Sequence, residues 1–148
     1  MAHLDHIGLA VHNVEEVARL FHRLLGFGVY KTERVERQGV VAHFLSAGDA
    51  QLELLEALGP DSPVARYLKA RGEGVHHLAF EVKGIHDHMQ RIRDLGFTPL
   101  SEMPVPGADG KLIFFLHPKE THGILIEFCE RVSASHERPA SSLGLSDA

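Results

Sequence analysis

Hydrophobic and polar positions follow the same plan twice along the chain. Two short apolar runs bounded by polar residues, 6–11 and 77–82, predict strands. After each run, apolar residues recur every three or four positions, which predicts a helix. These helices are expected to end at a glycine, Gly26 in the first half and Gly96 in the second. The chain therefore contains an internal repeat, which constrains its architecture more than any single element does.

Each half continues with three further predicted strands. Their ranges are 28–35, 39–46 and 50–56 in the first half, and 98–103, 111–116 and 123–130 in the second. An acid within an apolar run marks the last strand of each half, Glu53 and then Glu127. Two βαβββ modules follow, at about 4–57 and 75–131, with a connector at 58–74 that contains a short helix-like run.

These elements predict an α+β fold in which the two modules form one domain over residues 1–132. A pseudo-twofold arrangement of the modules would bring equivalent positions of the repeat together. The segment 133–148 is rich in serine and has little apolar periodicity, so we expect a flexible C-terminal tail there.

Composition narrows the class of protein. The chain has 148 residues, of which 44 % are hydrophobic and 24 % charged, as is usual for a globular domain. Its formal charge of -5 disfavours a general binder of nucleic acid or anionic membranes. Cys129 is the only cysteine, so an intramolecular disulfide and a cysteine-rich zinc module are excluded. No apolar run approaches the roughly 18 residues of a membrane span, and we expect a cytoplasmic location.

Polar side chains interrupt four of the predicted strands. Because side chains alternate between the two faces of a strand, His6 and His77 share a face with small residues and oppose the aliphatic face. Glu53 and Glu127 likewise oppose large apolar neighbours. An ionised carboxylate in such a strand is costly to bury unless it is paired or binds a cation. Two imidazoles and two carboxylates form a suitable donor set for zinc, manganese, cobalt, nickel or iron.

The chain has twelve histidines. For a histidine in an apolar strand, there is a simpler interpretation than metal binding. It can be a core residue whose ring nitrogens are satisfied by hydrogen bonds. The repeat favours metal binding instead, because each half supplies one histidine and one acid at matched positions.

Four segments then carry a family resemblance: DHIGLAV, ELLE, SPVARYLKARGEGVHHLAFEV and LHPKETHGILIEFCE. They resemble the vicinal oxygen chelate superfamily, also called the glyoxalase/bleomycin resistance/dioxygenase superfamily, and within it the methylmalonyl-CoA epimerases. The likeness runs from about Leu4 to Arg131. It implies a glyoxalase-like open β cup around one divalent metal ion, with cobalt, manganese, zinc, nickel and magnesium as candidates. The ligands that it implies in this chain are His6, Glu53, His77 and Glu127.

The resemblance also implies an activity, the interconversion of the two stereoisomers of methylmalonyl-CoA by removal and return of the C2 proton. An acyl-CoA thioester would be the substrate, and a homodimer is expected. Proton exchange on both faces of C2 calls for two bases or one mobile base, and Glu127 is the first candidate. Some epimerases carry a glutamate where this chain has Ala42. The neighbouring His43 becomes the second candidate, provided that a bulge turns it towards the pocket.

Two further segments are open to more than one interpretation. His76 precedes His77 and should face the opposite side of a regular strand, which favours a packing or hydrogen-bonding role. The loop at 106–111 could offer backbone donors and a lysine to thioester or phosphate oxygens. A glycine-rich connection between strands would form such a loop without any ligand.

Other functions of the same superfamily remain alternatives. The first is a glyoxalase I-type lactoylglutathione lyase, which moves a proton in a glutathione hemithioacetal. The second is a metal-free small-molecule-binding protein, and an extradiol dioxygenase ranks last because its chain is normally longer. The GEGVHH and HPKETHG segments favour the epimerase, and retention of all four polar positions argues against the metal-free binder.

Overall fold

The computed structural model describes residues 2–132, and the tail predicted at 133–148 lies outside these residues. The described residues form three helices, α1 (Val14–Leu25), α2 (Pro63–Arg71) and α3 (Ile85–Asp94). The strands in the same part of the chain are β1 (His3–Ala10), β2 (Val29–Val35), β3 (Val40–Ala47), β4 (Ala50–Ala57), β5 (Gly74–Glu81), β6 (Val105–Pro106), β7 (Lys111–Leu116) and β8 (Ile126–Arg131).

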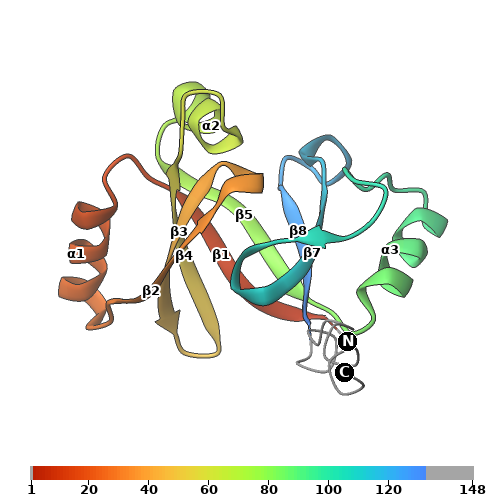
Figure 1. Cartoon of the computed structure of the whole chain (residues 1–148), viewed down its shortest axis with the longest axis horizontal. Helices are drawn as coiled ribbons and strands as arrows, with labels where there is room; N and C mark the ends of the chain where they lie inside the picture. Colours follow the sequence, from red (N-terminus) through yellow and green to blue (C-terminus); the bar gives the residue numbers. More distant parts are fainter. Residues whose placement is uncertain (1, 133–148) are drawn as a thin grey trace, which may run out of the picture.

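One sheet joins the two halves of the chain. Its strand order is β2-β3-β4-β1-β5-β8-β7-β6, so each half contributes four consecutive strands in equivalent order. The first strands of the two modules, β1 and β5, pair antiparallel in the middle of the sheet. Each of them also pairs in parallel with the last strand of its own module, β4 or β8. The predicted α+β fold with two βαβββ modules in pseudo-twofold arrangement is confirmed (Figure 1).

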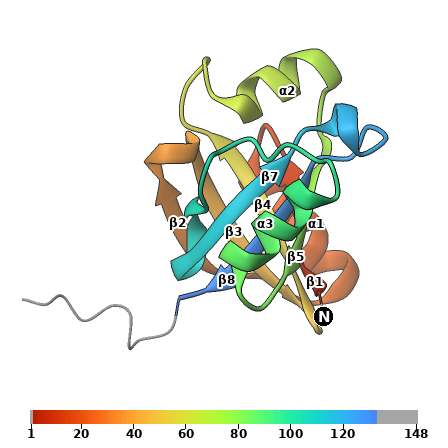
Figure 2. The same ribbon diagram turned by 90° about the vertical axis from the view of Figure 1, so that its right-hand side faces the viewer.

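Helices α1 and α3 cover the outer face of the curled sheet, one on each module (Figures 1 and 2). Helix α1 packs through Val14 against Leu45 and Leu54, and α3 packs through Ile85 and Met89 on its own module. Burying an aliphatic side chain of this size contributes about 1.5–3 kcal/mol, so these contacts hold both helices on the outer face. The inner face of the sheet is therefore left for other side chains.

Local sequence explains where the helices begin and end. Asn13 accepts a hydrogen bond from the Glu16 backbone N–H and caps the start of α1. Gly26 follows the helix with φ of 79°, and its N–H donates to the His22 carbonyl. The predicted end of α1 at this glycine is confirmed. None of the helices within residues 2–132 is long and apolar enough to cross a membrane.

One predicted strand is wrong. In place of a strand at 98–103, the second module has only the two-residue strand β6, and Pro99 makes an isolated bridge with Leu116. Pro99 lies within this segment and Pro104 directly follows it, and a proline has no N–H to donate to a sheet. Its apolar residues therefore do not continue the ladder.

Glu130 of β8 supplies the cap that α3 lacks in its own sequence. The residue before α3 is Gly84, which has no side chain, and the Glu130 carboxylate accepts hydrogen bonds from the N–H groups of Gly84 and Ile85.

We expect Glu130→Gln to lower the free energy of unfolding by about 1 kcal/mol, because it removes a negative charge from a helix N-terminus. Urea denaturation measures this change. Glu102→Gln, at an exposed loop position, is the control, and equal midpoints for the two variants would contradict the prediction.

Candidate metal centre

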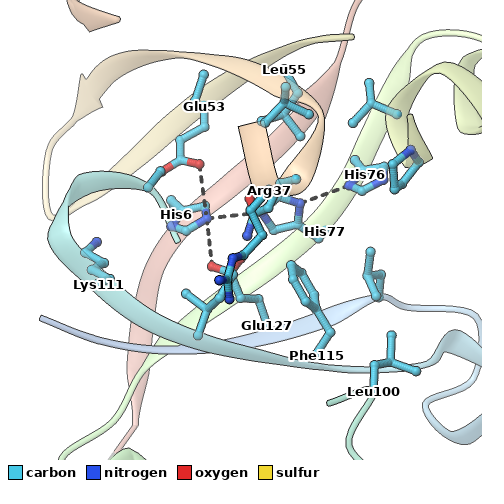
Figure 3. Close-up of a pocket in the computed structure, with 18 residues that line it drawn as sticks. His6, Arg37, Glu53, Leu55, His76, His77, Leu100, Lys111, Phe115 and Glu127 are labelled. Carbon is cyan, nitrogen blue, oxygen red and sulfur yellow. Dashed lines mark hydrogen bonds and ion pairs between the residues drawn. The ribbon is translucent and has the colours of Figure 1, made fainter. Parts of the chain in front are cut away.

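Four polar side chains gather on the inner face of the sheet (Figure 3). They come from the four central strands, one residue each from β1, β4, β5 and β8. All four are buried, with at most 6 % of each residue exposed: His6, Glu53, His77 and Glu127. The structure thus brings together all four residues that the sequence predicts as ligands.

Donor atoms of the four residues converge on the imidazole of His6. Its Nε2 lies 3.1 Å from Nε2 of His77, 3.2 Å from a Glu127 oxygen and 3.3 Å from a Glu53 oxygen. One compact group, formed by His6, His77 and Glu127, has donor atoms that all lie within 4.8 Å of one another. Glu53 stands beside this group and contacts it through His6.

The spacing of the two imidazoles suits a shared cation. Two nitrogen atoms that each lie about 2.0–2.1 Å from one ion can be about 3 Å apart, close to the 3.1 Å between Nε2 of His6 and Nε2 of His77. The mixed set of nitrogen and carboxylate oxygen donors is typical of zinc, manganese, cobalt and nickel sites. The residues present therefore fit a divalent metal ion.

Burial controls the protonation of these groups. It raises the pKa of Glu53 to about 7 and lowers the pKa of His77 to about 3. Burial also disfavours the charged form of His6, but hydrogen bonds to Asp5 and Glu127 outweigh it and raise the His6 pKa to about 10. Contact with His6 in turn holds the pKa of Glu127 below its usual value despite burial. Positive charge at His6 thus balances the buried carboxylates, and a divalent cation would displace this proton.

Gly8 makes the close approach of the two modules possible. It pairs with Glu53 on one side and with His77 on the other, in the middle of the sheet. A Cβ atom at position 8 would lie 2.2–2.8 Å from the His77 ring. Only glycine leaves room for the His77 ring beside β1.

Sequence reasoning assigned no role to Asp5 and suggested Lys111 only as a donor to thioester or phosphate oxygens. An Asp5 oxygen lies 2.7 Å from His6 Nδ1 and accepts a hydrogen bond from Lys111 Nζ at 2.6 Å. Burial acts to raise the pKa of Asp5, but the hydrogen bonds with His6 and Lys111 outweigh it and hold that pKa well below its usual value. The alternation of side chains along the strand places Asp5 on the outer face, so the sequence pattern does not predict its contact with His6.

His76 departs from its predicted orientation. It was expected to face away from His77, but its Nδ1 lies 3.0 Å from His77 Nδ1 and its side chain lines the inner cavity (Figure 3). The reason is a register shift between β1 and β5. Gly8 pairs with His77 and Leu9 pairs with Val75, which leaves His76 as an extra residue in a bulge.

The structure does not bring His43 to this group. Strand β3 pairs with β4 without a register shift, so the bulge that His43 requires is absent from this pairing. Ala42 lines the cavity, whereas His43 contacts Thr32 at 3.2 Å and Glu56 at 3.8 Å. The side chains of β3 keep their regular alternation here.

A cavity of about 290 Å³ opens beside the four polar residues. Its walls are mainly apolar, with Val40, Leu55, Ile113 and Phe115 among them, and Arg37 and Lys111 add positive charge. Two residues of the loop at 106–111, Ala108 and Lys111, belong to the lining. An apolar cavity with a few convergent polar groups is the usual form of a small-molecule site.

Comparison with known proteins gives a consistent assignment. Residues 5–115 match the family model described as Glyoxalase/Bleomycin resistance protein/Dioxygenase superfamily. The human mitochondrial methylmalonyl-CoA epimerase is 35 % identical, over 86 % of this chain and 73 % of its own length. The chain belongs to the methylmalonyl-CoA epimerase family of this superfamily. It is accordingly a member of a family of isomerases.

Other proteins match this chain over similar lengths. Protein YqjC of Bacillus subtilis is 38 % identical, over 92 % of this chain and 97 % of its own length. A solved structure of a Streptomyces coelicolor methylmalonyl-CoA epimerase variant, in complex with 2-nitronate-propionyl-CoA, is 37 % identical with a TM-score of 0.84. That comparison covers 88 % of this chain and 95 % of the Streptomyces chain.

Replacement of Gly8 tests the close packing at this centre. We expect Gly8→Ala to lower the free energy of unfolding by about 1–3 kcal/mol, because the added methyl group forces the His77 ring to move. Binding of Co²⁺ should weaken for the same reason. The control is Gly28→Ala, since a Cβ atom at that position meets no atom within 4 Å. Urea denaturation and calorimetric titration with Co²⁺ measure both effects, and a variant that binds Co²⁺ like wild type would contradict the prediction.

Proposed function

We propose that this protein is a divalent-metal-dependent epimerase that interconverts the two stereoisomers of methylmalonyl-CoA. The observation that carries the proposal is the convergence of two imidazoles and two carboxylates on one point beside an apolar cavity. The human relative is named as a methylmalonyl-CoA epimerase, and the Streptomyces structure contains an acyl-CoA analogue. The name of the human relative and the compound bound in the Streptomyces structure both support a CoA thioester as the substrate.

The ligands of the cation in this proposal are His6, Glu53, His77 and Glu127. A divalent cation held by these residues would supply positive charge that stabilises a developing negative charge on the thioester oxygen. The charge of the site supports a divalent ion, because its two buried carboxylates carry two negative charges when ionised. Lys111 balances the third acid, Asp5, through a 2.6 Å ion pair.

Glu127 is the base that we assign to the first proton transfer. It is buried at the cavity wall, and the contact with His6 keeps its pKa below the usual value, so it is ionised at neutral pH. An ionised carboxylate beside C2 can accept the proton, and the apolar walls keep bulk water from competing for it.

The second proton carrier in this proposal is Glu53. It is the other carboxylate among the described residues that line the cavity, and burial raises its pKa to about 7. His43, which the sequence suggested for this role, points away from the cavity lining.

Proton exchange at C2 tests the proposed activity directly. The wild-type protein loaded with Co²⁺ or Mn²⁺ should exchange the C2 proton of methylmalonyl-CoA for deuterium in D₂O and interconvert the stereoisomers. Removal of the metal by a chelator should abolish both reactions, and adding it back should restore them. A metal-loaded protein that is inert to this thioester but active on glutathione hemithioacetal would replace the epimerase proposal by a lactoylglutathione lyase.

Glu127→Gln separates proton transfer from folding. The amide keeps the shape of the side chain but cannot accept the C2 proton, so we expect turnover to fall by about 10²–10⁴-fold. Metal-dependent turnover is measured beside the unfolding midpoint of the same preparation. Turnover close to wild type in a folded, metal-loaded variant would exclude Glu127 as the base.

Glu53→Gln should affect the two stereoisomers unequally. With one base left, the variant should exchange the C2 proton of one stereoisomer for deuterium while epimerisation is nearly lost. Mass spectrometry of each separated stereoisomer measures this pattern. His43→Gln is the matched comparison, and the same unequal pattern in that variant alone would assign the second proton transfer to His43.

The assembly and location of the protein complete the proposal. We propose a homodimer, and the outermost strands β2 and β6 of the open sheet offer edges at which copies could pair. Light scattering of the purified protein measures the mass of the particle. A cytoplasmic location is likewise proposed, and fractionation of cells tests it.

A further inference from the structure

A pair of bulges precedes the two histidines of the candidate metal centre. In β1, Leu4 pairs with Phe80 and His6 pairs with Ala79, so Asp5 has no partner in β5. In β5, the equivalent shift leaves His76 without a partner in β1. Each extra residue stands immediately before a histidine of the centre, at matched positions of the two modules.

These bulges change which way the extra side chains point. On a regular strand, the residue before a histidine faces the opposite side of the sheet. Here the side chains of Asp5 and His76 instead reach the Nδ1 atoms of the histidines that follow them, at 2.7 Å and 3.0 Å. Both histidines thus have Nδ1 engaged and present Nε2 to the same point, with the two Nε2 atoms 3.1 Å apart.

The chemistry of imidazole gives this arrangement a consequence. A neutral imidazole has one N–H and one free nitrogen, and only the free nitrogen binds a metal ion. A partner that accepts a hydrogen bond from Nδ1–H fixes the tautomer in which Nε2 is free and also fixes the ring orientation. Asp5 accepts through a carboxylate oxygen, and His76 can accept through its own Nδ1.

We propose that Asp5 and His76 are positioning residues that engage Nδ1 of His6 and His77 and so direct both Nε2 atoms at one shared cation, which would displace the Nε2 proton of His6. The inference rests on the metal dependence in the proposed function. Asp5 and His76 do not bind the ion themselves; they act through the histidines that follow them. Lys111 belongs to the same arrangement, because its ammonium group lies 2.6 Å from the Asp5 oxygen that also contacts His6.

The Asp5 and Lys111 pair also explains how a third acid is tolerated near the two buried glutamates. Side chains of Asp5 and Lys111 are 13 % and 5 % exposed, so neither is well solvated. A lone carboxylate there would be costly to bury, and pairing with the ammonium group offsets part of that cost. Asp5 can therefore orient His6 without adding net negative charge to the centre.

Binding of Co²⁺ to the full-length protein, measured by calorimetric titration, tests the proposal. We expect Asp5→Asn and His76→Leu each to weaken Co²⁺ binding by about 10–100-fold, the usual effect of losing a partner of a ligand histidine. His76→Gln should recover much of the affinity, because its side-chain oxygen can accept a hydrogen bond. Nitrogen-15 NMR of the metal-free protein should show the His77 proton on Nδ1 in wild type and a shift towards Nε2 in His76→Leu.

Controls separate positioning from folding. Glu130→Gln matches Asp5→Asn, because it makes the same change in a carboxylate that caps a distant helix. His88→Leu matches His76→Leu, because His88 is a partly buried histidine that packs on Phe128 away from the cavity. Both controls should bind Co²⁺ like wild type. Asp5→Asn removes the closer of two carboxylates at the Lys111 ammonium group, 2.6 Å away against 3.9 Å for Asp109, and can lower stability. His76→Leu breaks no ion pair, so it decides the outcome if Asp5→Asn does not fold.

The outcomes distinguish this inference from the proposed function. If the wild-type protein binds no Co²⁺, the metal dependence in the proposed function is contradicted, and this inference fails with it. Wild-type protein that binds Co²⁺, with folded Asp5→Asn and His76→Leu variants of equal affinity, would overturn this inference alone. Weaker binding that His76→Gln does not restore and that brings no change in the His77 tautomer would indicate a merely structural role.

Discussion

Two carboxylates buried on the inner face of a single sheet set the main constraint on this protein. Glu53 and Glu127 lie in strands whose other faces pack against an apolar core, and both acids are buried. A buried carboxylate needs a compensating positive charge or a proton. His6 supplies one positive charge by taking up a proton, since its pKa is raised to about 10. A divalent cation at the same point would supply two positive charges in place of that one.

The duplicated fold supplies the geometry that this constraint requires. Pairing of β1 with β5 places the first strands of both modules side by side, and β4 and β8 flank them. Each module then contributes one imidazole and one carboxylate to the same point. Gly8 lets the His77 ring lie against β1, and the two bulges turn Asp5 and His76 towards the histidines that they precede. The centre thus depends on contacts between modules rather than within either one.

The apolar walls of the cavity strengthen the electrostatic interactions of the four polar residues beside it. Residues such as Leu55, Ile113 and Phe115 surround the cavity beside the centre and limit the access of water. Electrostatic interactions are stronger in such surroundings than in bulk solvent. A carbon acid as weak as the C2–H of a thioester is ionised only if charge is stabilised as it develops, and a site of this kind is suited to that step.

The sequence by itself determined the repeat, the three helices, most of the strands and the four polar residues of the centre. Those features follow from side-chain period, which is a local property of the chain and is readable from apolar and polar positions. It also indicated the family, through segments spread over most of the chain. The strand expected at 98–103 is absent, although the apolar pattern there resembled that of a strand. Pro99 within this segment and Pro104 directly after it have no N–H to donate to a ladder.

Only the tertiary structure decided which side chains reach the histidines. Asp5 and His76 belong on the outer face by alternation, and bulges in the β1 and β5 pairing bring them inside. His43 needed such a bulge and does not have one, since β3 pairs regularly with β4. A bulge arises from the register of two strands that are distant in the chain, so no local pattern contains it.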